Sequence, residues 1–123
     1  MFGKKKNTIV RNIYDTEYDA LLDERWKASQ KLSDAVATCL IKETKTHLFP
    51  ENVESYEQAY LEYDQAKHDV FTAKLHYIVI RQKLIDYYLT NHEHFRYCSE
   101  YTDPTNYIDA DTIIERAIVR RAN

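Results

Sequence analysis

The chain has 123 residues and a formal net charge of −3, with 44% hydrophobic and 30% charged residues, a balance typical of a globular domain rather than a disordered segment. It contains one glycine and two prolines, which disfavours the many turns of a β-sandwich or barrel and predicts a few long helices. The net charge gives no basic footprint for nucleic acid across the domain as a whole.

Residues 1–14 form a basic lead-in that we expect to be weakly ordered, and residues 15–123 are predicted to form a single helical domain. The lead-in carries three consecutive lysines, Lys4, Lys5 and Lys6. A solvated tail is the simpler interpretation of such a run, and contact with nucleic acid or an anionic membrane surface is the disfavoured alternative. No signal peptide and no membrane-spanning run of ~18 apolar residues is recognisable. The cytoplasm is therefore the expected compartment.

The first helix is predicted over residues 15–46. Thr16 and Asp19 have the spacing of a capping box at its start. Apart from one serine, apolar residues then recur at helical spacing, at Tyr18, Leu22, Trp26, Ser29, Leu32, Val36, Cys39 and Leu40. Pro50 fits the first turn of a following helix. The short connection makes the two helices antiparallel neighbours.

The second helix is predicted over residues 51–91 and carries the clearest pattern in the chain. Apolar or aromatic residues follow one another at spacings of three and four, alternating large and small, at Tyr56, Ala59, Tyr63, Ala66, Val70, Ala73, Tyr77, Ile80, Leu84 and Tyr87. Residues 64–70 and 71–77 repeat Ala-Lys at the same heptad positions. A seven-residue repeat implies left-handed supercoiling against a partner helix.

A hairpin fold sets the facing pairs between these two helices. It places Trp26 near Ala73, Leu32 near Ala66, and Tyr18 near Ile80 or Leu84. A large ring over an alanine is favourable packing, because small residues let a neighbouring helix approach closely. The predicted packing seam comprises Trp26, Tyr63, Ala66, Val70, Ala73 and Tyr77.

A second apolar line on the same helix consists of Phe71, Ile78, Ile85 and Leu89, with Leu75 near it. It predicts a second neighbour for the helix, which is the C-terminal segment, another subunit, or both. The chain also has 11 tyrosines. Tyrosine suits interfaces because its ring packs while its hydroxyl stays hydrogen-bonded. We therefore expect a homodimer that forms a helical bundle, and the candidate interface comprises Phe71, Ile78, Ile85, Leu89, Tyr60 and Tyr88.

Residues 92–107 are predicted to form a loop, and a short third helix is predicted over residues 111–121. Thr112 and Glu115 again have capping-box spacing. A helix this short forms only when it is docked. We expect it to fold back over the second apolar line of the long helix or to reach into a partner subunit.

Clustered catalytic groups are not recognisable in the sequence. His92 and His94 flank Glu93, but a metal site would need further ligands, and an exposed helix end is the simpler interpretation. His68 and His76 belong to no Glu-x-x-His motif, which disfavours a di-iron bundle. The single glycine, Gly3, excludes glycine-rich phosphate loops. We expect no enzyme activity, no metal and no cofactor.

Several short stretches are similar to a known family: residues 1–6 (MFGKKK), 18–22 (YDALL), 25–26 (RW), and the Ala-Lys heptad at 66–67. Over about half of its length the chain resembles the YaaL-like family of small uncharacterised cytosolic proteins of Gram-positive bacteria. The extended second helix and the C-terminal segment have no counterpart in that family. The resemblance implies a bacterial, cytosolic helical hairpin and brings no activity or site residues.

The sequence thus predicts an all-α protein, a long antiparallel hairpin with a short C-terminal helix. The expected function is a non-catalytic protein–protein interaction module, either an adaptor, a regulator, or a phage- or mobile-element-encoded binder of a host protein. One alternative is a nucleic-acid or membrane-surface accessory that uses Lys4, Lys5 and Lys6. Another is a secreted helical hairpin, disfavoured because the turn carries Leu48, Phe49 and Pro50 in place of Trp-x-Gly.

Overall fold

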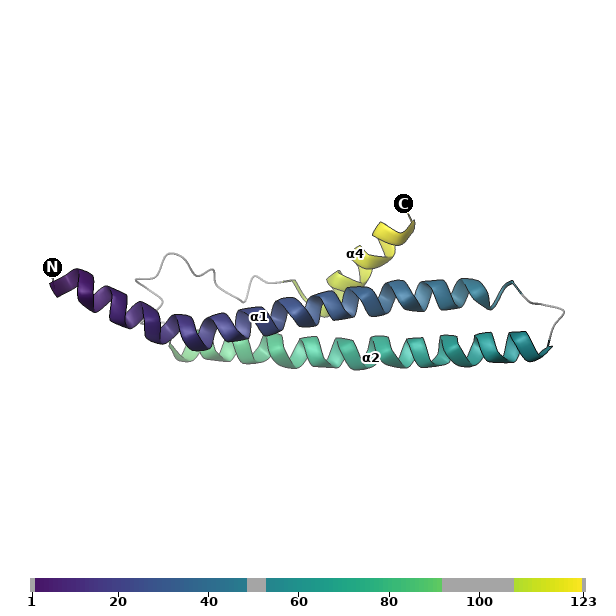
Figure 1. Cartoon of the computed structure of the whole chain (residues 1–123), viewed down its shortest axis with the longest axis horizontal. Helices are drawn as coiled ribbons and strands as arrows, with labels where there is room; N and C mark the ends of the chain where they lie inside the picture. The colour runs from purple at the N-terminus through teal and green to yellow at the C-terminus, as the bar shows by residue number, and fades with distance from the viewer. Residues whose placement is uncertain (1, 49–52, 92–107, 123) are drawn as a thin grey trace. The chain divides into compact units, whose positions relative to one another are not determined.

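The computed structural model describes residues 2–48, 53–91 and 108–122, and helices account for nearly all of them (Figure 1). They are α1 (Phe2–Lys45), α2 (Val53–Thr90) and α4 (Ala110–Ala122). No strand occurs in these ranges. The all-α class is therefore confirmed.

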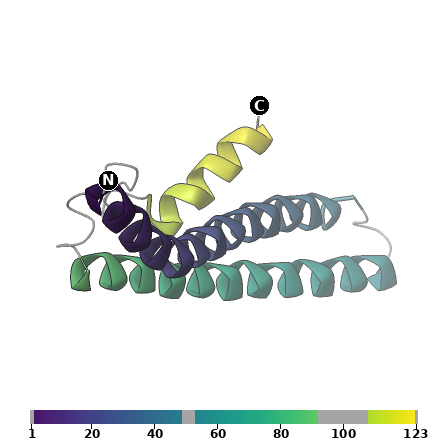
Figure 2. The same ribbon diagram turned by 60° about the vertical axis from the view of Figure 1, so that its left-hand side comes forward.

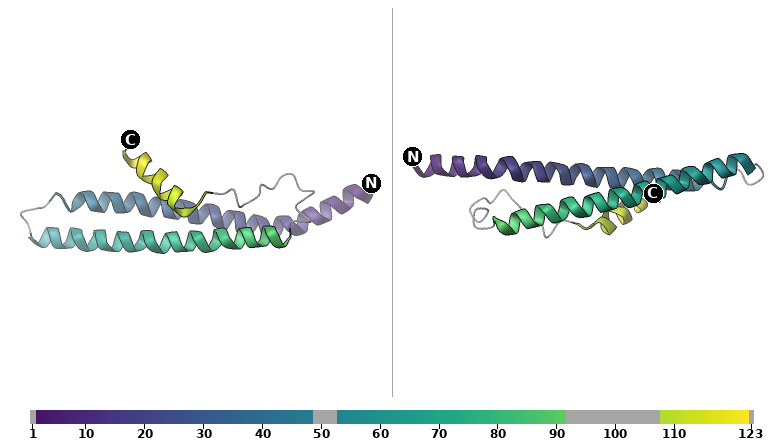
Figure 3. Two further views of the ribbon diagram at one scale, coloured as in Figure 1. Left: turned by 180° about the vertical axis from the view of Figure 1, so that it is seen from behind. Right: turned by 90° about the horizontal axis from the view of Figure 1, so that it is seen from below.

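The chain divides into two compact units, and both long helices pass through both. Unit 1 joins Met1–Lys27 to Val79–Tyr107, and unit 2 joins Ala28–Ile78 to Ile108–Asn123. Within unit 2, the end of α1 and the start of α2 form an antiparallel hairpin (Figure 3). Both units contain parts of the same two helices, so this division does not by itself separate two domains. The expectation of a single domain stays a prediction.

The first helix begins at Phe2 rather than near residue 15, so the expected boundary of the basic lead-in is wrong. The physical reason is that no glycine or proline interrupts the chain between Lys4 and Lys45. Thr16 consequently lies inside the helix and does not cap its start.

The other predicted helices are present, at boundaries that differ by one or two residues. The cap of α4 is not the predicted one. The carboxylate of Asp109 accepts a hydrogen bond from the backbone N–H of Thr112 at 2.8 Å, so Asp109 takes the capping role that the sequence suggested for Thr112. The predicted loop over residues 92–107 and the proposed first-turn role of Pro50 lie outside the described residues.

The core of unit 2 is built where α1, α2 and α4 meet. Its buried residues are Ala28, Leu32, Val36, Ala73, Tyr77, Ala110, Ile113 and Ala117. Half of them are alanines, which let the three helix backbones approach closely. The alternation of large and small residues on α2 is therefore used inside the chain.

Helix α4 docks on this core through its N-terminal half (Figure 2). The Tyr77 hydroxyl donates a hydrogen bond to the backbone carbonyl of Ile108 at 2.6 Å, and the Lys74 ammonium lies 2.9 Å from the Asp111 carboxylate. The helix thus packs on its own chain. It does not cover Phe71 and Ile78 as expected, and both stay exposed.

The core of unit 1 is a smaller cluster around Tyr18 and Leu84, which are both fully buried. The Tyr18 ring centre lies 6.0 Å from that of Tyr87 and 6.5 Å from that of Tyr88. The predicted pairing of Tyr18 with Leu84 is present.

Trp26 is the main error in the predicted packing seam. Its side chain is 56% exposed, so it is not the buried ring that the predicted seam requires. The inward positions of α1 run from Tyr18 to Ala28 and Leu32. Stepping back seven residues from Leu32 reaches residue 25, so Trp26 lies about 100° around the helix from the core-facing position. The predicted placement of Trp26 over an alanine is therefore wrong, because position 26 is not in the core-facing register of α1.

We therefore expect Trp26→Ala to lower the free energy of unfolding by about 1 kcal/mol or less, the range of exposed positions rather than of buried rings. Urea denaturation followed by circular dichroism measures this change. A loss of 3 kcal/mol or more, roughly the value for truncating a buried aromatic side chain, would contradict the exposed placement of this ring.

Candidate protein-contact surfaces

One side of α2 in unit 2 carries large apolar side chains that stay about half exposed among the described residues. Phe71, Leu75 and Ile78 are 57%, 46% and 44% exposed. Their spacing of four and three places them on one face of the helix. This surface, called here the outer face of α2, lies away from the side on which Ala73 and Tyr77 are buried.

Two lysines of α2 near the outer face form ion pairs within the chain. The Lys67 ammonium lies 3.2 Å from the Asp64 carboxylate, and Lys74 pairs with Asp111. The hydrogen bond to Asp64 raises the pKa of Lys67, so this cation stays charged at neutral pH. A partner that covers the outer face therefore does not need to bring a counter-charge for these groups.

Three tyrosines continue along α2 toward its start. The ring centres of Tyr56 and Tyr60 lie 6.1 Å apart, and those of Tyr60 and Tyr63 lie 6.3 Å apart with an edge-to-face geometry. The Lys67 ammonium lies 4.6 Å from the Tyr63 ring centre. Tyr56 and Tyr60 are exposed, while Tyr63, predicted for the packing seam, is half-buried.

The remaining members of the predicted packing seam and of the candidate interface differ in their burial. Ala66, Ala73 and Tyr77 of the packing seam are buried, and Val70 packs against the unit 2 core. Of the candidate interface, Leu89 in unit 1 is exposed.

Two members of the candidate interface are corrected by the structure. Ile85 is buried, and Tyr88 packs beside Tyr18. The seven-residue spacing from Phe71 drifts around a straight helix. The drift turns Ile85 toward the interior of unit 1, while Leu89, four residues further on, returns to the surface.

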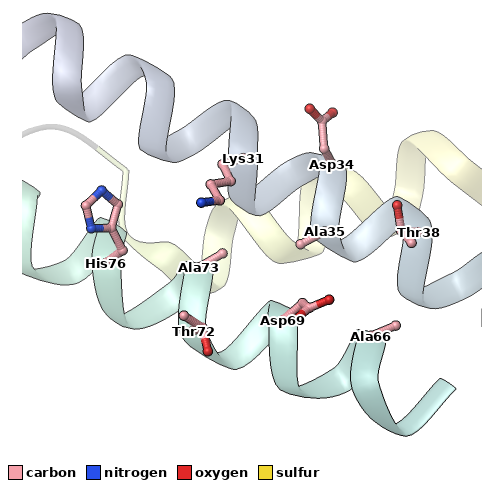
Figure 4. Close-up of a pocket in the computed structure, with 9 residues that line it drawn as sticks. All are labelled: Lys31, Asp34, Ala35, Thr38, Ala66, Asp69, Thr72, Ala73 and His76. Carbon is pink, nitrogen blue, oxygen red and sulfur yellow. The ribbon is translucent and has the colours of Figure 1, made fainter. Parts of the chain in front are cut away.

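A groove lies between α1 and α2 within unit 2 (Figure 4). It has a volume of about 500 Å³ and is lined by Lys31, Asp34, Ala35, Thr38, Ala66, Asp69, Thr72, Ala73 and His76. Alanines form its apolar part, and charged or hydroxyl side chains stand around them. Apolar spacing alone gives no sign of this groove, because most of its lining is polar. The polar residues beside Ala35 and Ala73 were the available signal.

Metal-binding and catalytic side-chain types do not cluster in the described residues. No cluster of three His, Cys, Asp or Glu side chains that could hold a metal occurs there. Cys39 is half-buried, and burial raises the pKa of its thiol, which makes the nucleophilic thiolate scarcer. His92 and His94 lie outside the described residues, as do the side chains of Lys4, Lys5 and Lys6.

Within the described helices, none has a stretch long and apolar enough to cross a membrane. No family model, curated protein or solved structure matches the chain. The resemblance to the YaaL-like family therefore stays a prediction.

Proposed function

We propose that this chain is a non-catalytic protein-binding module and that the outer face of α2 contacts its partner. The observation that carries this proposal is that Phe71, Leu75 and Ile78 stand exposed on one helix face while the opposite side of the same helix is packed. Fully burying a side chain of this size is favourable by about 1.5–3 kcal/mol. A partner that covers all three gains a substantial part of that energy.

The physical character of the surface supports a protein partner. Phe71 supplies an aromatic anchor, and Tyr60 offers a second, half-exposed ring further along the helix. Aromatic residues are enriched at the centres of protein interfaces, where they contribute much of the binding energy. An amphipathic helix laid along α2 would meet anchors at this spacing.

The proposed role is that of an adaptor or regulator in a bacterial cytoplasm, or of a phage- or mobile-element-encoded binder of a host protein. The proposed bacterial setting rests on the sequence resemblance, whereas the proposed contact surface rests on the exposed residues of α2. The two parts of the proposal are therefore tested separately.

The test of the contact surface is site-specific photocrosslinking in the native host. A photoreactive phenylalanine analogue at position 71 is expected to trap one protein of defined mass. The same analogue at Gln58, which is exposed and about 220° around the helix from Phe71, is expected to trap none. Equal labelling from both positions would refute the outer face as the contact surface.

A substitution provides the quantitative measurement once that partner is known. Phe71→Asp is expected to weaken binding by roughly tenfold or more, as truncating a buried aromatic anchor does. Gln58→Asp adds the same charge elsewhere and is expected to leave the affinity unchanged. Undiminished binding by Phe71→Asp would contradict the proposal.

A further inference from the structure

The C-terminal end of α4 carries a basic face that the core of unit 2 leaves free. Ala117 is the last buried residue of this helix among those described, and the helix then runs away from the hairpin (Figure 2). Val119 and Arg120 lie three and four residues after Arg116, so the three share one side of the helix, and all are exposed. Within the described residues neither arginine forms an ion pair. This surface is called here the basic face of α4.

The first turns of α2 carry a face of the opposite charge. Glu57 and Leu61 lie three and seven residues after Glu54, so these residues also share one side of their helix, and all are exposed. Neither glutamate forms an ion pair in the part of the chain that the structure describes. The helix dipole favours acidic residues at the start of a helix, but it does not account for a leucine that is more than half exposed between them and solvent. This surface is called here the acidic face of α2.

The two faces are complementary, because each joins two unpaired charges of one sign to one exposed aliphatic side chain. They are too far apart to meet within one chain. In the cluster that holds α4, the α2 residue nearest to Glu57 is Val70, which lies thirteen residues or about 20 Å further along the helix. Beyond Ala117, α4 advances only about 5 Å to reach Arg120. A second molecule is therefore needed to bring such faces together.

We propose that the basic face of α4 docks on the acidic face of α2 in a second copy of this chain. The guanidinium groups then meet the two glutamates, and Val119 meets Leu61. The chain already joins these two helices through an ion pair of the reverse sense, between Lys74 of α2 and Asp111 of α4. A two-fold dimer makes the new contact twice, which matters because a single exposed ion pair contributes little.

The second copy is favoured over an unrelated acidic protein because both halves of the contact are present on this chain. Glu57 also lies fourteen residues or about 21 Å along α2 from Phe71. Phe71, Leu75 and Ile78 of the outer face of α2 therefore stay open to a different partner, and self-association goes beyond the proposed function.

The test is the dissociation constant of self-association, measured by sedimentation velocity over a concentration series of the full chain. Arg116→Glu with Arg120→Glu makes both faces acidic, and Glu54→Lys with Glu57→Lys makes both faces basic. Each double variant alone is expected to self-associate roughly tenfold more weakly than the wild type or worse, because like charges then oppose each other. An equimolar mixture of the two variants is expected to recover most of the wild-type affinity, because every acidic face then meets a basic one.

The controls separate this contact from general charge effects. Glu24→Lys with Glu43→Lys makes the same charge change at exposed positions of α1 and is expected to leave the affinity unchanged. Circular dichroism is expected to show intact helices in every variant, because all the substituted side chains are exposed.

Three results would overturn the proposal. They are a wild-type chain that stays monomeric at all concentrations, a self-association insensitive to the two double variants, and a mixture that associates no better than either variant alone. Phe71→Asp is expected to self-associate normally, which separates failure of this contact from failure of the proposed partner surface.

Discussion

Replacing Tyr77 with alanine is expected to lower the free energy of unfolding by about 3–5 kcal/mol, the range for truncating a fully buried aromatic side chain. Tyr77 is 0% exposed and lies where α1, α2 and α4 meet. The substitution leaves a cavity at this junction and removes the hydrogen bond to the carbonyl of Ile108. Urea denaturation monitored by circular dichroism gives the change directly.

Two matched substitutions separate the contributions of the ring and the hydroxyl. Tyr77→Phe removes only the hydrogen bond to Ile108 and is expected to cost about 1 kcal/mol. Tyr56→Ala removes an exposed tyrosine of the same helix and is expected to cost about 0.5–1 kcal/mol. If Tyr77→Ala costs no more than Tyr56→Ala, the three-helix junction is wrong.

The second large effect is expected in unit 1. Tyr18 is 0% exposed and packs with Leu84, Tyr87 and Tyr88. Tyr18→Ala is therefore expected to cost about 3–5 kcal/mol. Leu89→Ala serves as the control in the same unit, because Leu89 is 56% exposed and its truncation is expected to cost less than about 1 kcal/mol. Equal losses from these two substitutions would contradict the assigned core of unit 1.

The helical class and the buried side of α2 could be predicted from the sequence because both follow from spacing alone. Ala59, Ala66, Ala73, Tyr77, Ile80 and Leu84 are buried as their three–four spacing implies. The scarcity of glycine and proline disfavoured the turn-rich all-β folds. Patterns of this kind depend on the period of the helix, which is fixed by backbone geometry.

The placement of Trp26 could not be predicted in the same way. Positions 25 and 26 both follow Tyr18 at spacings that fit a helix, and the choice depends on which residues of α2 lie opposite. The preference for a large ring over a small alanine selected Trp26, while the register set by Ala28 and Leu32 leaves it exposed. The match in size between two side chains is therefore a weaker guide to core packing than the helical register.

The docking of α4 could not be predicted either. The sequence offered two apolar surfaces on α2 to receive this helix. The contact of Tyr77 with Ile108 and the ion pair of Lys74 with Asp111 decide between them in the folded chain. Neither follows from helical spacing. Because α4 uses the seam, Phe71 and Ile78 remain on the surface, and the candidate contact region changes from the whole predicted line to its first part.

The central claim is that α2 uses one side for the chain's own core and leaves the opposite side open to a partner. The most direct test is the rate of thiol labelling at two neighbouring positions, in a chain whose Cys39 and Cys98 are replaced by alanine. A cysteine at Phe71 is expected to react nearly as fast as in the unfolded chain. A cysteine at Ala73, which is 4% exposed, is expected to react roughly a hundredfold more slowly, because it must wait for local opening. Equal rates at the two positions, or faster labelling at position 73, would contradict the account.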